Sequence, residues 1–203
     1  MLDRKTLNKF ISEIKKAYSQ FSVWMYTNNE FAKHQKTWND IPKPRKLFKT
    51  EEFSREKGCK YKNFWDVVIP SLQHGWILSI ARLFDPPYFS GDTKKQNPRL
   101  SLYYILELLE DNKLKQFIRD EINKHQKFIK SIKKQRDNVL AHKSVRFDER
   151  RIEAGVENLF NTLDEIIIRI EEAKPHLRDC GKINLEYIGK LSECGAQEVF
   201  EKL

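Results

Sequence analysis

The residue types best suited to chemistry lie together at positions 136–142, RDNVLAH. Arg136 carries a permanent charge on a forked guanidinium, which can hold a phosphate and stabilise negative charge in a transition state. The imidazole of His142, with an ordinary pKa of about 6.5, can take a proton from a ribose 2′-hydroxyl or give one to a leaving 5′-oxygen. Asp137 or Asn138 can orient either group. This set of groups suits RNA cleavage and needs neither a metal ion nor a cofactor.

Helix geometry limits how Arg136 and His142 can meet. The apolar spacing of Ile132 and Val139 places Arg136 on or beside a buried stripe, where its charge needs a carboxylate partner or a cleft. Positions six apart lie about 240° around a helix and about 9 Å along it. The two side chains therefore converge only if the helix ends between them, or across a two-fold axis between two copies. The alternative is an interface salt bridge beside a core or capping histidine.

Positive charge is concentrated around the same stretch. The net charge is +9, and residues 113–151 hold 13 Lys and Arg against 5 Asp and Glu. Such a segment can be a solvated helix face, or it can bind a polyanion such as RNA or an acidic protein. If the partner is RNA, we expect the substrate-binding groups to be Asn138 and the cations that follow: Lys133, Lys134, Lys143, Arg146, Arg150 and Arg151.

The amino-acid composition bears on the fold class, on metal and disulfide sites, and on the cellular location. Hydrophobic residues make up 39% and charged residues 33% of 203 residues, and 7 Gly and 7 Pro are few for a β-sandwich or barrel. Three Cys without a CxxC pair indicate neither a zinc site nor a disulfide framework and fit a reducing cytosol. No 18-residue apolar run and no apolar leader occurs, so we expect a cytoplasmic protein away from membranes. The other histidines lack metal-ligand spacing: His34, His74, His125 and His176.

Apolar periodicity predicts an all-α bundle of five or six helices in one domain, 1–203. The expected helices span 3–41, 60–84, a short one at 101–109, 113–140, 150–174 and 184–202. A short extra helix from about 50 is an option, and Gly58 ends that connector. The helix at 60–84 has the widest apolar arc and is expected to be central, with a kink at Pro70. Arg82 and Asp85 form a local ion pair or cap, or line a cleft beside Arg136.

Two segments resemble a known family. Residues 136–142 have the Arg–polar–(four residues)–His pattern of the HEPN superfamily, near the end of a long helix late in an all-α bundle. Residues 78–85 (LSIARLFD) and 100–102 (LSL) resemble its AbiU-type, abortive-infection branch. The resemblance covers a core at about 60–174, with the helices at 3–41 and 184–202 as additions.

The resemblance implies a homodimer whose two motifs face each other. It implies a metal-independent endoribonuclease with Arg136 and His142 as the catalytic pair and Asp137 as their polar helper. The setting it implies is antiphage defence or a toxin–antitoxin system, with an antitoxin protein as a partner. Some members carry a Tyr two residues after the His, where a partner adds nucleotides; Ser144 stands there in this chain. The alternative is a non-catalytic HEPN-like module that dimerises or binds nucleic acid or a partner protein.

Overall fold

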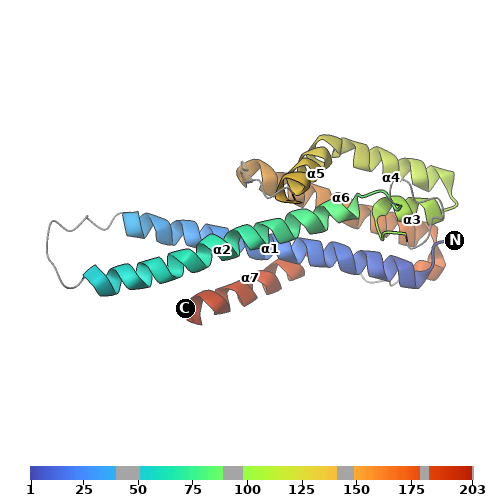
Figure 1. Ribbon diagram of the computed structural model, residues 1–203. Coiled ribbons are helices and arrows are strands. Elements are labelled where there is room, and N and C mark those ends of the chain that lie inside the picture. Colours follow the sequence, from blue (N-terminus) through green and yellow to red (C-terminus); the bar gives the residue numbers. More distant parts are fainter. Residues whose placement is uncertain (40–50, 89–97, 141–148, 179–182, 203) are drawn as a thin grey trace.

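The chain folds into an all-α bundle in a computed structural model that describes residues 1–39, 51–88, 98–140, 149–178 and 183–202. Two long helices, α1 (Arg4–Asn39) and α2 (Glu51–Leu83), run antiparallel. The helices α3 to α6 gather beside the C-terminal part of α2, and α7 lies along α1 (Figure 1). The described residues contain helices and no strands, as the periodicity predicts.

Helix α1 forms because it begins on a capping carboxylate and carries one apolar stripe. The Asp3 side chain accepts from the Thr6 amide at 2.7 Å, which satisfies one of the donors left open at a helix start. Leu7, Phe10 and Ile14 are fully buried. The predicted bounds of 3–41 match the observed helix closely. Helix α1 packs against α2, α6, η1 and α7, so α1, and not the expected 60–84 helix, is central.

An aromatic cluster holds α1 to α2. The ring of Trp76 on α2 lies 5.3 Å from that of Trp24 and 5.5 Å from that of Phe21, both on α1. All three side chains are almost completely buried. Ring pairs at this separation add about 0.5–1.5 kcal/mol each beyond the area they bury. These two tryptophans therefore belong to the core.

Helix α2 is longer than the periodicity suggests. It runs without a break from Glu51 through Pro70 to Leu83, so the prediction of a separate short helix before a start at 60 is wrong. Gly58 lies inside α2 and does not end a helix, since a glycine inside a long helix costs only about 1 kcal/mol. Beyond Leu83 the backbone tightens, with amides of Phe84 and Asp85 bonded three residues back at 3.1 and 3.2 Å. Two prolines follow and end the helix.

The expected helix at 113–140 is in fact two helices. Helix α4 (Asn112–Lys124) and helix α5 (Gln126–Leu140) meet at His125. The His125 amide bonds to the Ile122 carbonyl at 3.0 Å, a tighter turn than an α-helix makes. Its ring bonds to the Thr162 hydroxyl on α6 at 2.8 Å. With this break, the described residues form seven α-helices and one short 3-10 helix, more than the five or six predicted.

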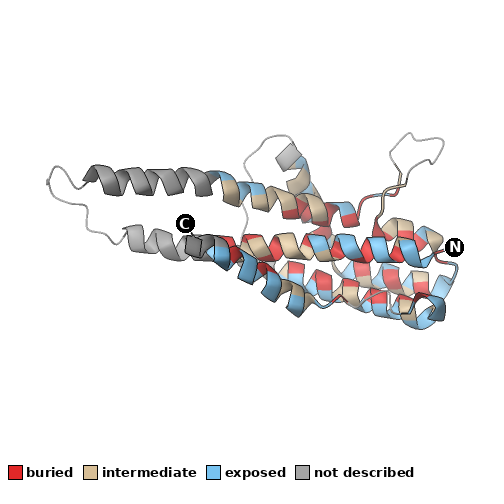
Figure 2. Ribbon diagram, turned by 90° about the horizontal axis from the view of Figure 1, so that it is seen from below, coloured by how far each residue is buried: buried red, intermediate tan, exposed pale blue. Residues whose placement is uncertain are grey.

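The remaining helices close the bundle. Helix α3 (Leu102–Leu108) begins on Ser101, whose hydroxyl accepts from the Tyr104 amide at 3.4 Å. Helix α6 (Glu149–Ala173) and the turn η1 (Pro175–Leu177) lead to α7 (Leu185–Lys202). Figure 2 shows buried positions in bands on the sides where helices meet, with exposed positions outside. In the part of the chain that the structure describes, no helix is long and apolar enough to cross a membrane.

Candidate active site

Arg136 is joined to a carboxylate from another helix end. Its Nη1 lies 2.5 Å from Asp85 Oδ1, just beyond the end of α2. Its Nε donates to Asp137 Oδ1 at 3.0 Å. The Arg136 side chain is 22% exposed and that of Asp85 is 10% exposed. The sequence predicts a carboxylate partner or a cleft for this arginine, and the structure shows both.

A second cation on α5, Lys133, also contacts the end of α2. The ammonium of Lys133, one turn before Arg136, donates to the Phe84 carbonyl at 2.5 Å. The last carbonyls of a helix have no partner within it and carry the negative end of its dipole, so a lysine is favourable there. Lys133 and Arg136 thus bind consecutive residues, Phe84 and Asp85, where the chain leaves α2. This double contact fixes the position of Arg136 against α2.

The two cations respond to this environment in opposite ways. Burial disfavours the charge of Arg136, yet hydrogen bonds to Asp85 and Asp137 outweigh burial and raise the pKa of Arg136. Burial lowers the pKa of Lys133, and the nearby Arg136 lowers it further while Asp85 opposes the shift. Arg136 therefore stays charged at any working pH, as phosphate binding requires.

Arg136 opens onto a hollow of about 730 Å³. The hollow is lined by three cations, three carboxylates and apolar residues: Arg82, Arg99, Arg136, Glu13, Asp85, Asp137, Leu78, Leu83 and Leu100. Arg99 lies 3.7 Å from the second oxygen of Asp85. Of the two sequence options for Arg82 and Asp85, the structure therefore supports the one in which both line a cleft beside Arg136.

The other predicted site residues divide into two groups. Asp137 is 66% exposed at the rim of the hollow. Asn138 donates to the side chain of Gln135 at 3.5 Å, and Lys134 is exposed. Lys133 is half-buried and bound to the Phe84 carbonyl. The predicted His142, Lys143, Arg146 and Arg150 cannot be placed: the first three lie outside the described residues, and no side-chain position is described for Arg150 or for Arg151.

Two charged residues of the lining, Arg99 and Glu13, are not predicted as site residues from the sequence. Arg99 reaches the hollow because its amide bonds to the Pro87 carbonyl at 2.7 Å, which brings the segment before α3 back to the end of α2. Glu13 comes from α1, on an exposed position of that helix. Neither residue lies near Arg136 in the sequence, and no local pattern marks them. Only the packing of four segments brings them together.

The described groups around Arg136 can bind a phosphate. The contacts with Asp85 and Asp137 occupy at most three of the five N–H groups of Arg136, so further donors remain for an anion. A guanidinium held in place by two carboxylates has little freedom left to lose when it binds.

The helical fold and the Arg136 motif together define an all-α domain of the HEPN type. The model of the AbiU2 family, HEPN_AbiU2, matches residues 46–174, more than half of the chain. The chain belongs to this family. Comparison with curated proteins gave no match, and comparison with solved structures gave none either.

Proposed function

We propose that the protein is a metal-independent endoribonuclease whose site forms across a homodimer. The observation that carries the proposal is the placement of Arg136, which is fixed by Asp85 and Asp137 at the edge of an open hollow. His142, six residues on, supplies the proton-transfer group. Membership of the AbiU2 family supports a role in abortive infection, in antiphage defence or a toxin–antitoxin system with an antitoxin as partner.

In the proposed reaction the ribose 2′-oxygen attacks the adjacent phosphorus and the 5′-oxygen leaves. The imidazole of His142 takes the 2′-hydroxyl proton or protonates the leaving oxygen, and water serves for the other proton transfer. Arg136 binds the non-bridging oxygens, on which charge grows. Asp137 keeps the guanidinium oriented. The products are a 2′,3′-cyclic phosphate and a 5′-hydroxyl.

We further propose that the basic groups around the motif bind the flanking phosphates. Lys134 is exposed on α5 and suits this role. Asn138, Lys143 and Arg146 are assigned to it from their place in the sequence. Lys133, on α5, contributes the positive charge of its ammonium, which is bonded to the Phe84 carbonyl at the end of α2. Binding of this kind weakens steeply as salt concentration rises.

A non-catalytic dimerisation or nucleic-acid-binding module is the second candidate. The observation that favours it is the pairing of Arg136 with Asp85 inside one chain. Such a pair holds a fold together without any chemistry. Both candidates include a basic face and a dimer, so only RNA cleavage distinguishes them: the enzyme cleaves RNA and the non-catalytic module does not.

The test is RNA cleavage by purified full-length protein in excess EDTA. We expect wild type to cut single-stranded RNA and leave cyclic phosphate ends. We expect His142→Ala to lose cleavage while it keeps the dimer mass of wild type in light scattering. Lys130→Gln, an exposed lysine on α5, is the control for loss of positive charge. If His142→Ala cleaves as wild type does, the assignment of this histidine is wrong.

A further inference from the structure

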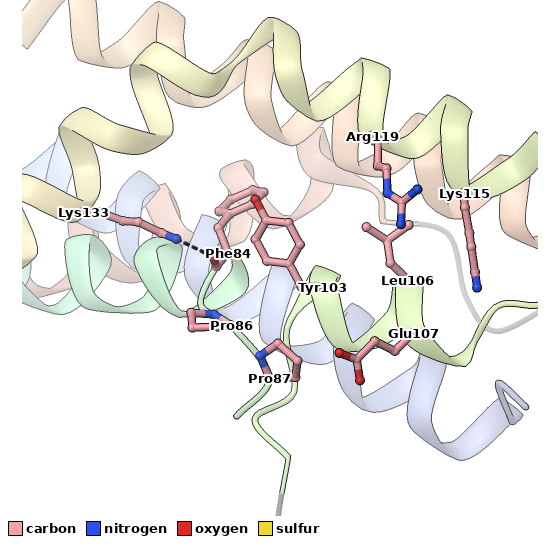
Figure 3. Close-up of a pocket in the computed structure, with 9 residues that line it drawn as sticks. All are labelled: Phe84, Pro86, Pro87, Tyr103, Leu106, Glu107, Lys115, Arg119 and Lys133. Carbon is pink, nitrogen blue, oxygen red and sulfur yellow. Dashed lines mark hydrogen bonds between the residues drawn. The ribbon is translucent and has the colours of Figure 1, made fainter. Parts of the chain in front are cut away.

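A second hollow lies on the other side of the α2 end. It measures about 610 Å³ and is walled by α3, α4, α5 and the Phe84–Pro87 segment (Figure 3). Its lining joins aromatic and proline rings to charged side chains: Phe84, Pro86, Pro87, Tyr103, Leu106, Glu107, Lys115, Arg119 and Lys133. Its size falls within the range of small-molecule sites, about 300–1,000 Å³.

One wall of this second hollow is cationic. Lys115 and Arg119 lie one turn apart on α4, and both extend toward the hollow (Figure 3). Side chains four residues apart share one helix face, so both can contact one phosphate. With Lys133 they make three cations against the single carboxylate of Glu107. The hollow therefore favours an anionic ligand.

The opposite wall is flat and apolar. Tyr103 presents its ring between the two prolines and α4, and the buried Leu106 lies beside it (Figure 3). The ammonium of Lys133 lies 5.9 Å from the centre of the Tyr103 ring. Nucleobases stack on such rings whatever their sequence. Glu107 offers only acceptor oxygens, which match an amino group of a base or a ribose hydroxyl.

We propose that this second hollow binds one nucleotide unit. Lys115 and Arg119 hold its phosphate, and Tyr103 with the prolines holds its base. The nucleotide is either a unit of an RNA strand or a free nucleotide, because both present the same chemistry.

The two hollows share a wall. Phe84 lines the second hollow and Asp85 the first, and Lys133 and Arg136 lie one turn apart on α5. One turn of helix is about 5.4 Å, so Lys133 and Arg136 lie close enough for one RNA strand to contact both. In this form the inference rests on the proposed function, since it names a neighbouring subsite for the same RNA.

Binding is measured on the full chain carrying His142→Ala, so that cleavage plays no part. The probes are a fluorescent single-stranded hexanucleotide RNA, AMP and inorganic phosphate. The test variant is Lys115→Gln with Arg119→Gln. The matched control is Lys127→Gln with Lys130→Gln, which removes the same charge from exposed positions on α5 outside the lining. Circular dichroism confirms that each variant is folded.

We expect the test variant to bind RNA about tenfold more weakly than the control at equal salt. Tyr103→Leu should weaken RNA binding about fivefold, the loss of one stacking contact. If the control binds AMP and the test variant does not, the site takes a free nucleotide. If neither protein binds AMP but the test variant binds RNA more weakly, the site takes a unit of an RNA strand. Equal RNA binding by test and control variants, with no AMP binding, overturns the proposal. So does phosphate competing as well as AMP, since the base is then not recognised.

Discussion

The pairing of Arg136 with Asp85 makes a quantitative prediction about stability. Pairs exposed to solvent contribute about 0.2–1 kcal/mol, and breaking a fully buried pair costs about 3–5 kcal/mol. With side chains 22% and 10% exposed, this pair lies between those limits. We therefore expect a coupling free energy of about 1–2 kcal/mol between Arg136 and Asp85.

The coupling is measured by a double-mutant cycle with Arg136→Ala, Asp85→Ala and the double variant, each unfolded in urea. Each kcal/mol lost should lower the melting temperature by about 2–4 °C in a chain of this size. The matched control is the Arg169–Glu172 pair at 3.1 Å, whose side chains are 55% and 59% exposed. Its coupling should stay below about 0.5 kcal/mol.

The reasoning is refuted if the Arg136–Asp85 coupling is no larger than that of the control pair. Asp85 would then not fix the guanidinium, and the placement of Arg136 would carry no argument for a preorganised site. If the coupling has the expected size and the protein cleaves RNA as proposed, Asp85→Ala should also slow cleavage, because Asp85 holds Arg136 in place.

Three further predictions concern the scaffold. Gly155→Ala should lower the free energy of unfolding by about 1 kcal/mol, because the new Cβ would lie 2.6 Å from the Phe128 ring. Gly195→Ala is the control: its Cβ would meet nothing within 4 Å, so it should raise the free energy of unfolding by about 0.5–1 kcal/mol. Asp111→Ala removes the side-chain acceptor at the start of α4 and should cost about 1 kcal/mol in urea unfolding. Burial lowers the pKa of His125, so the unfolded chain takes up its proton first and stability falls as pH drops below about 6.5. His125→Gln should flatten that pH dependence, and an unchanged slope would contradict it.

Much of the helical fold was predictable because the signals are local. Spaced apolar residues and the Asp85-Pro86-Pro87 stop place α1 and the end of α2 within about two residues. The break at His125 was not predictable, because apolar spacing continues across it and no Gly or Pro marks it. At this turn the ring of His125 bonds to Thr162 on another helix, a contact that the local sequence does not reveal.

The site was predictable only in part, for the same reason. Because Arg136 lies on the apolar stripe of a helix, the sequence predicts that its charge is paired with a carboxylate or faces a cleft. Which carboxylate provides it depends on how α5 meets the end of α2, and no local pattern contains that information. The second hollow depends even more on packing, since Tyr103, Lys115 and Lys133 come from three different helices.

Co-expression of two inactive variants tests the central claim most directly. Arg136→Gln and His142→Ala, carrying different tags, are purified as the mixed dimer and assayed for RNA cleavage in EDTA. A site shared between two copies retains one arginine and one histidine, so the mixed dimer should cleave at a rate on the order of a quarter of wild type or more, while each variant alone is inactive. An inactive mixed dimer beside an active wild type would contradict the shared site, and an inactive wild type would contradict the enzyme.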